Sequence, residues 1–157
     1  MKKYLAVLSL LSIISISLAM PVGFEGGAGY VLEEHYNCFF VNGSALLKIT
    51  NNFYARTQLA GLSFHSDNTL INIGTMSPLD LLFFFPSETF NPYGLAGVNL
   101  TTGDGSTKFY LRTGAGVEFK FNNARFFPFV EADLDLELHR PGGTHNEITL
   151  KGGIRVK

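Results

Sequence analysis

The sequence predicts an all-β fold, an eight-stranded antiparallel up-and-down transmembrane β-barrel. Several segments alternate between charged and apolar residues, which is the pattern of a strand with one polar and one apolar face. Beyond Pro21 no window has helical periodicity of useful length, while turn signals recur at the spacing of short strands. The chain also begins with a segment typical of exported proteins. Together these observations predict a transmembrane β-barrel that forms after the chain has been exported.

The clearest alternation runs from Phe129 to Leu138, where acidic residues occupy one parity and apolar residues the other. In a soluble protein the apolar face would be packed and the charged face wet. In a closed transmembrane barrel the apolar face meets lipid and the charged face lines the interior. The same pattern recurs from Lys108 to Phe121 and from Glu147 to Val156. Three successive strands of this kind favour the transmembrane barrel.

The N-terminal segment predicts a cleaved signal peptide over residues 1–19. Lys2 and Lys3 precede an apolar run, and Ser17-Leu18-Ala19 supplies the small residues that a signal peptidase reads. The run is shorter than the roughly 20 apolar residues that cross a bilayer as a helix. No cysteine stands at the junction, which argues against a lipid anchor. We therefore expect cleavage before Met20 and one barrel domain over residues 20–157.

The amino-acid composition limits the classes of partner that the protein is expected to bind. The formal net charge is -1, which is too small to indicate nucleic acid or another strongly charged partner. Cys38 is the only cysteine, so no internal disulfide can form, and we interpret it as a small apolar strand residue. Phe, Tyr and Gly are abundant and Trp is absent, which fits strands and tight turns better than helices.

The strands follow one another with turn signals between them. Most reach the roughly 9–11 residues that cross a bilayer when a strand is tilted. The fourth contains Pro78, which removes a ladder hydrogen bond unless it lies at a bulge or outside the membrane. In chain order, the expected strands are Val22 to Leu32, Cys38 to Thr50, Phe53 to Phe64, Thr69 to Phe85, Phe90 to Thr101, Thr107 to Phe121, Arg125 to Leu138 and Asn146 to Val156.

The connections predict which end of the barrel holds the termini. Asn51-Asn52, the segment 86–89 and the segment 122–124 are short and rich in residues that tolerate tight turns. They follow the second, fourth and sixth strands, so they share one end with both termini. This is the arrangement of a bacterial barrel with periplasmic turns and outward-facing loops.

Aromatic residues cluster near both strand ends, as expected for the belts that mark the membrane interfaces. The set at the turn end is the denser one. It comprises Phe53, Tyr54, Phe83, Phe84, Phe85, Phe90, Tyr93, Phe119, Phe121, Phe126, Phe127 and Phe129. A thinner set near the loops comprises Tyr30, Phe39, Phe40, Phe64, Phe109 and Tyr110.

Charged residues of the inward parity predict a structural ion-pair network inside the barrel. An eight-stranded barrel has an interior only wide enough for side chains, so these groups would fill it and leave no open channel. The expected members are Glu25, Lys108, Arg112, Glu131, Asp133, Asp135, Glu137, Lys151 and Arg155. Glu25 would join the network when the first strand closes the barrel.

A two-residue turn at Asn122-Asn123 would set the pairing of these charges. It places Lys120 opposite Arg125, and the same register pairs Arg112 with Asp133 and Lys108 with Glu137. On the other side of the seventh strand we expect Lys151 to face Asp133 or Asp135. Arg155 would lie near Glu131 or Phe129.

Three functional interpretations of the sequence are less favoured. The carboxylates of the seventh strand could form a cation site or an acid–base pair, but adjacent basic strands supply compensation. His35, His65, His139 and His145 all fall in expected loops, and none has the spacing that preorganises a metal site. Glycine clusters such as Gly103-Asp104-Gly105 lack the following helix of a nucleotide site. We therefore expect no catalytic, cofactor or metal site.

Four segments resemble the later strands of small outer-membrane β-barrel proteins. They are Phe90-Asn91-Pro92-Tyr93-Gly94-Leu95-Ala96-Gly97-Val98-Asn99-Leu100, Gly114-Ala115-Gly116-Val117-Glu118-Phe119, Pro128-Phe129-Val130-Glu131-Ala132 and Gly152-Gly153-Ile154-Arg155-Val156-Lys157. The families concerned are those grouped with the transmembrane domains of OmpA, OmpX and OmpW. The resemblance implies a bacterial outer-membrane location, contact with outer-membrane lipid and handling by the barrel-assembly machinery. Such families end in an aromatic residue, whereas this sequence ends in Lys157.

The function expected from these observations is a non-enzymatic structural, adhesive or protective role in the envelope, with no cofactor and no nucleic-acid partner. Two alternatives stay open. One is a narrow, porin-like pore or small-molecule conduit, which requires a continuous gap through the interior. The other is a soluble periplasmic barrel of lipocalin type, with the apolar face turned inward around a ligand.

Overall fold

The computed structural model describes residues 22–32, 37–64, 69–73, 79–103, 106–121, 125–138 and 146–157. Within these ranges there is no helix long and apolar enough to cross a membrane. The predicted signal peptide, Pro78 and the four histidines lie outside them. The strands are β1 (Val22–Leu32), β2 (Asn37–Lys48), β3 (Phe53–Phe64), β4 (Thr69–Ile73), β5 (Leu79–Phe84), β6 (Phe90–Gly103), β7 (Ser106–Phe119), β8 (Phe126–Leu138) and β9 (Asn146–Val156).

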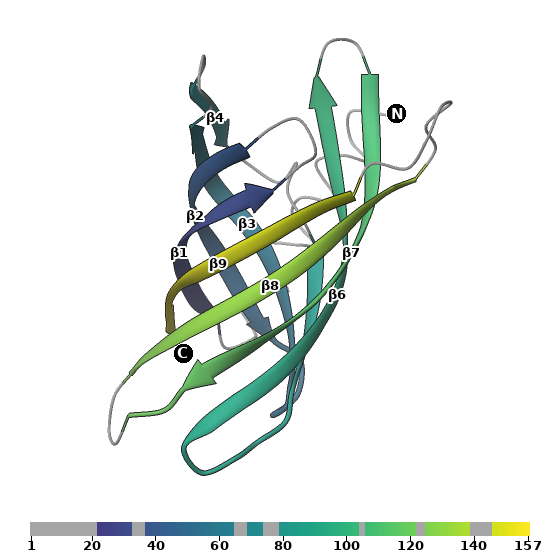
Figure 1. Ribbon diagram of the computed structural model, residues 1–157. Helices are drawn as coiled ribbons and strands as arrows, with labels where there is room; N and C mark the ends of the chain where they lie inside the picture. Colours follow the sequence, from purple (N-terminus) through teal and green to yellow (C-terminus); the bar gives the residue numbers. More distant parts are fainter. Residues whose placement is uncertain are drawn as a thin grey trace, which may run out of the picture.

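Antiparallel pairing joins the strands into a closed cylinder, seen from the side in Figure 1. β1 pairs with both β2 and β9, which closes the ring. β4 and β5 both pair with β3, so they are two parts of one interrupted strand. The barrel therefore has eight strands in up-and-down order, and the predicted fold is confirmed. Apart from this interruption, the predicted strand boundaries are right to within two residues.

One end of the barrel, here called the turn end, carries the connections 49–52, 85–89 and 120–125. Ile49 N–H donates to Phe53 O at 2.9 Å, and Phe85 N–H donates to Pro92 O at 2.8 Å, so the ladders run on into these connections. Phe24 at the start of β1 pairs with Val156 at the end of β9, which places both at this end. The opposite end, the loop end, is where β8 finishes and β9 begins.

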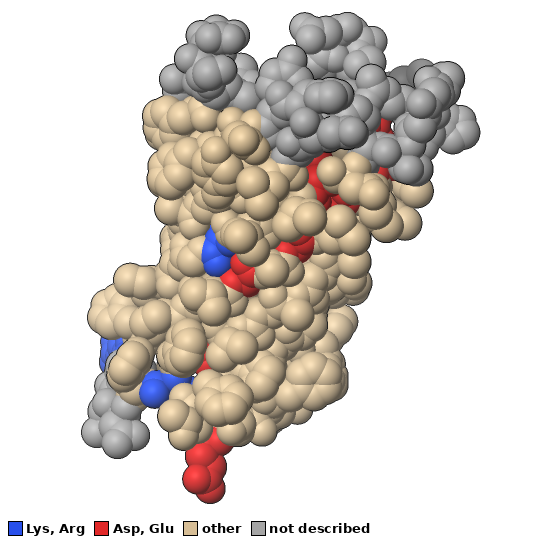
Figure 2. Space-filling view, in the orientation of Figure 1, with Lys and Arg blue, Asp and Glu red and all other residues tan. Residues whose placement is uncertain are grey.

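The two faces of the wall differ sharply in polarity. Side chains that point outward are apolar and exposed, such as Phe126 at 60%, Val130 at 54% and Ile154 at 50%. Their inward neighbours Glu131 and Arg155 are 4% and 0% exposed. Figure 2 shows the result from one side, where most of the wall between its two ends carries no charged atoms. The alternation predicted from sequence therefore places charge inside and apolar groups outside.

The aromatic belt at the turn end is thinner than predicted. Phe84, Tyr93 and Phe129 were expected in it, but they point into the barrel and are 4%, 2% and 2% exposed. Each has the inward parity of its strand, which overrides its position near a turn. The exposed phenylalanines at this end are Phe24, Phe83, Phe85, Phe90, Phe119, Phe121 and Phe126.

The predicted pairing of β7 with β8 is wrong by two residues. Arg112 pairs with Asp135 where Asp133 was expected, and Glu137 pairs with Tyr110 where Lys108 was expected. The same register, which ends with Glu118 opposite Phe129, does not bring Lys120 opposite Arg125. β7 ends at Phe119 and β8 begins at Phe126, so the connection is longer than the two-residue hairpin assumed. A shift of two residues keeps every side chain on its predicted face.

Candidate functional site

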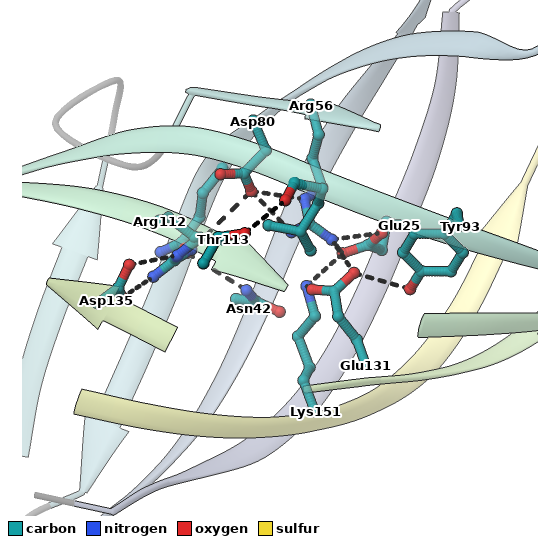
Figure 3. Close-up of polar contacts among 12 residues, drawn as sticks. Glu25, Asn42, Arg56, Asp80, Tyr93, Arg112, Thr113, Glu131, Asp135 and Lys151 are labelled. Atoms are coloured by element: carbon teal, nitrogen blue, oxygen red, sulfur yellow. Dashed lines mark hydrogen bonds and ion pairs between the residues drawn. The ribbon is translucent and has the colours of Figure 1, made fainter. Parts of the chain in front are cut away.

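The barrel interior is the candidate site, because it gathers most of the buried charge of the described residues. Seven carboxylates and five basic side chains lie there, drawn in part in Figure 3. The carboxylates are Glu25, Asp80, Glu118, Glu131, Asp133, Asp135 and Glu137, and the basic residues are Arg56, Arg112, Lys151, Arg155 and Lys157. They form two groups, one toward the turn end and one toward the loop end.

Arg56 of β3 is one centre of the group toward the turn end. Its Nη1 donates to Glu131 Oε2 at 2.7 Å and to Glu25 Oε1 at 3.3 Å. Its Nε and Nη2 donate to Asp80 Oδ2 at 2.9 Å and 2.7 Å. One guanidinium thus joins carboxylates from β1, β5 and β8 across the width of the barrel (Figure 3). Arginine suits this position because its planar group presents donors in several directions.

Arg155 of β9 is the second centre and is fully buried. Its Nε donates to Glu25 Oε2 at 2.7 Å, and its Nη2 donates to the Tyr93 hydroxyl at 2.9 Å and to Glu131 Oε2 at 3.2 Å. The guanidinium carbon lies 4.1 Å from the centre of the Phe129 ring and 4.4 Å from that of Tyr93. Charge pairing and cation–π contact therefore hold the same group from several sides.

Two lysines complete this group. Lys151 Nζ donates to Glu25 Oε1 at 2.8 Å and lies 3.1 Å from Glu131 Oε1. Lys157 Nζ donates to Glu118 Oε1 at 2.9 Å and lies 4.1 Å from the centre of the Phe84 ring. We call the set Glu25, Arg56, Tyr93, Glu118, Glu131, Lys151, Arg155 and Lys157 the turn-side network.

The group toward the loop end has fewer cations. Arg112 donates through Nε to Asp135 Oδ1 at 2.8 Å, and its Nη1 lies 3.9 Å from Asp80 Oδ2. Asp133 and Glu137 are 4% and 5% exposed, and neither forms an ion pair with another side chain of the described part. We call Arg112, Asp133, Asp135 and Glu137 the loop-side carboxylate group.

Inward-facing glycines make room for the large side chains of the interior. A Cβ on Gly116 of β7 would collide with the ring and hydroxyl of Tyr93 and lie 2.7 Å from Val130 O. A Cβ on Gly153 of β9 would lie 2.7 Å from Gly27 Cα and 2.9 Å from the Phe129 ring. These close approaches explain why glycine stands at inward positions of strands that otherwise favour side chains.

The outer wall carries a shallow groove with a volume of about 660 Å³. Gly94, Ala115 and Ala132 form its floor, because they are small residues at neighbouring positions on β6, β7 and β8. Phe85 and Leu150 stand at its sides. The groove is almost entirely apolar and adds no chemical group to the interior.

The structure brings together most of the residues expected in the interior, with different partners. Lys151 pairs with Glu131, not with Asp133 or Asp135 as expected. Arg155 lies opposite Phe127 in the ladder, and its side chain reaches both Glu131 and Phe129. Lys108 lies on β7 paired with Thr101, and its side chain is outside the described part.

Four members of the interior were not predicted from sequence: Arg56, Asp80, Tyr93 and Lys157. Glu118 has the charged parity of its segment but was not among the expected members of the network. Arg56 and Asp80 are single charges at the inward parity of β3 and β5, and that parity was the available signal. Tyr93 was assigned to the outer belt. Lys157 has the inward parity of Lys151 and Arg155, but it lies one residue beyond the last strand and was not counted with it.

The chemistry available in the interior is charge pairing. Each carboxylate of the turn-side network is held by at least two cations, which leaves none of them as a general base. In the part of the chain that the structure describes, no three His, Cys, Asp or Glu side chains converge as metal ligands. Cys38 is buried, and its thiol donates weakly to Phe39 O at 3.4 Å.

Comparison with known proteins supports the fold and identifies no family. No protein-family model matches the chain, and no curated protein matches it either. Among solved structures, Neisserial surface protein A (NspA) is 15% identical, with a TM-score of 0.62 over 87% of this chain and 95% of that chain. The N-terminal β-barrel domain of Pseudomonas aeruginosa OprF is 18% identical, with a TM-score of 0.54 over 85% and 96%.

A third similar structure comes from the de novo design of transmembrane β-barrels. It is 14% identical, with a TM-score of 0.52 over 85% of this chain and 93% of that chain. At these identities the likeness concerns the fold alone. The chain therefore shares the eight-stranded barrel architecture of these structures, and its interior side chains must be interpreted on their own contacts.

Proposed function

We propose that the protein is a bacterial outer-membrane β-barrel with a structural, adhesive or protective role in the envelope. The observation that carries the proposal is the polarity of the wall, which is apolar outside and charged inside. Lipid would cover the outward phenylalanines and aliphatic residues, whose exposure to water would otherwise be costly. A closed barrel also satisfies its backbone hydrogen bonds within the wall, as the interior of a bilayer requires.

The filled interior supports a role that needs no conduction. Arg56 and Arg155 each bond to carboxylates from different strands, so their side chains cross the lumen and tie its sides together. Phe129 and Tyr93 pack against the Arg155 guanidinium and fill space that water would need. Passage through this network would require breaking several buried ion pairs at once. Single-channel recordings in planar bilayers should therefore show no reproducible steps.

The opposite polarity would be needed for a soluble lipocalin-type barrel, whose ligand-binding lumen is apolar. Here Glu25, Glu131 and Arg155 occupy the lumen.

The proposal also includes export with cleavage before Met20, insertion by the barrel-assembly machinery and contact with outer-membrane lipid.

Membrane extraction tests the proposal. The full chain is expressed in a Gram-negative host, and its membranes are washed with high salt and with carbonate before detergent is added. We expect the protein to remain in the membrane until detergent is present, with Met20 as its first residue by mass spectrometry. Release by carbonate alone would exclude the membrane role, and a conductance step would replace the structural role with a pore.

A further inference from the structure

The groove on the outer wall has a floor of small residues between larger side chains. Gly94 pairs with Ala115, and Ala115 pairs with Ala132, so the three form one outward row across β6, β7 and β8. A Cβ added to Gly94 would meet no atom within 4 Å. Phe85 and Leu150, at the sides of the groove, are 56% and 50% exposed. The outer wall is therefore recessed at this row.

The groove extends from this row toward the turn end. Pro92, Val117 and Val130 form the next outward row, because Pro92 pairs with Val117 and Val117 pairs with Val130. Lys120 follows three residues after Val117, about 10 Å further along at the usual rise of a strand. Its ammonium donates to Ser87 O, in the connection that follows β5, at 2.5 Å. A cation therefore lies at the margin of the groove that is nearer the turn end.

The basic side chains at this margin lack carboxylate partners. Lys120 and Arg125 lie at the two ends of the connection between β7 and β8, and neither forms an ion pair with a described carboxylate. Glu88, the exposed carboxylate of the neighbouring connection, pairs with neither of them. The hydrogen bond to Ser87 leaves the Lys120 ammonium two further donors. Figure 2 shows basic atoms at the lower left, next to the uncharged part of the wall.

We propose that the groove binds one acyl chain of an anionic glycerophospholipid, whose phosphate lies against Lys120 and Arg125. Small floor residues let methylene groups approach the backbone closely, which adds dispersion contacts that larger side chains would block. The basic side chains attract an anionic headgroup at the membrane surface. The apolar groove then receives the chain that continues from that headgroup into the bilayer. This inference rests on the proposed membrane location and adds a specific lipid to it.

Native mass spectrometry of the folded protein in detergent micelles measures this binding. The delipidated protein is titrated with phosphatidylglycerol and with phosphatidylcholine that carry the same acyl chains. We expect a 1:1 complex with phosphatidylglycerol that is about fivefold tighter, because only this lipid has a net negative charge. Ala132→Phe should weaken the binding of both lipids at least about tenfold, since the ring takes the place of the chain. Lys120→Gln should weaken the binding of phosphatidylglycerol alone.

Two substitutions on β2 are the matched controls. Ala45→Phe adds the same ring to another outward position, because Ala45 pairs with the exposed Phe24. Lys48→Gln removes a lysine at the end of β2 nearer the turn end. Neither should change the affinity for either lipid. If Ala132→Phe does not fold, as judged by the gel mobility of unheated samples, Ala115→Phe fills the same row and takes its place.

The two parts of the site should also depend on each other. In the Ala132→Phe protein, Lys120→Gln should have little further effect, because no bound chain then holds the headgroup in place. Equal weakening by Ala45→Phe and Ala132→Phe would overturn the proposal, as would equal affinity of the unaltered protein for the two lipids. A protein that stays in carbonate-washed membranes and gives either of these results would contradict the lipid site alone, so the site and the proposed function can fail separately.

Discussion

The turn-side network and the loop-side carboxylate group occupy one lumen but differ in how their charges are balanced. Glu131 and Asp133 show the contrast most closely, because they are successive inward residues of β8. Glu131 bonds to Arg56 and Arg155 and lies 3.1 Å from Lys151, whereas Asp133 pairs with no described basic side chain. Within this acidic stripe, Glu131 and Asp135 pair with basic side chains, whereas Asp133 and Glu137 have no ion pair with a described basic residue.

The neighbouring strands explain the difference. On the turn side, β9 contributes Lys151 and Arg155, and β3 contributes Arg56. On the loop side, the residue of β9 opposite Asp133 is Thr149, and the residue opposite Asp135 is Glu147. We infer that the turn-side network holds the barrel together, while the loop side contributes less to stability.

Removing Arg155 should be the most damaging single change. Arg155→Met would leave Glu25, Glu118 and Glu131 with fewer cations in a buried site and would lose the stacking on Phe129. Breaking a buried ion pair in this way typically costs about 3–5 kcal/mol. Urea unfolding of the barrel in lipid vesicles, followed by the gel mobility of unheated samples, measures the loss. Arg125→Met at an exposed turn position is the control and should change stability by less than about 0.5 kcal/mol.

Paired substitutions on β8 test the comparison itself. Glu131→Gln should cost about 2–3 kcal/mol, because it removes the charge that Arg56 and Lys151 share. Asp133→Asn should cost less than about 1 kcal/mol, since that carboxylate forms no ion pair with a described basic side chain and its Oδ1 has no described hydrogen-bond partner to lose. The same urea assay applies to both variants. Equal costs would show that the two halves of the lumen do not differ as described.

Packing inside the turn-side network gives a smaller effect. Gly116→Ala would force the Tyr93 ring away from its hydrogen bonds with Glu131 and Arg155, at a cost of about 1–3 kcal/mol. Gly94→Ala is the matched control on the outer face, where an added Cβ meets nothing within 4 Å. It should be neutral to within about 0.5 kcal/mol in the urea assay. A neutral Gly116→Ala would mean that the interior has room to repack.

The face of the wall on which a side chain lies follows from local sequence, whereas the register between strands and the contacts across the lumen depend on the closed barrel. Alternation assigned residues such as Asp133 and Lys151 to the inner face, because side-chain direction along a strand has a period of two. The partner predicted for Arg112 was wrong, because the register of β7 against β8 depends on the connection after β7. That connection is longer than the two residues assumed. The predicted inward and outward faces were still right, because a register error of an even number of residues keeps each side chain on its face.

Contacts across the lumen were beyond sequence reasoning. Arg56 reaches Glu131, 75 positions away, only because the tilt and stagger of the closed barrel bring β3 and β8 face to face. No local sequence pattern encodes the offset between the strands of the closed barrel. The inward parity of Arg56 and Asp80 could have placed both in the lumen, but not their partners.

The central claim is that one face of β8 meets lipid while the other lines a filled lumen. Single cysteines at positions 130, 132 and 134 and at positions 131, 133 and 135, in a Cys38→Ser background, can carry a nitroxide label in vesicle-reconstituted protein. Collision rates with oxygen, which concentrates in the bilayer, are then compared with those of a water-soluble nickel chelate. The account predicts high oxygen and low chelate accessibility at 130, 132 and 134, alternating with low oxygen accessibility at the other three. High chelate accessibility at 130, 132 and 134 would contradict it.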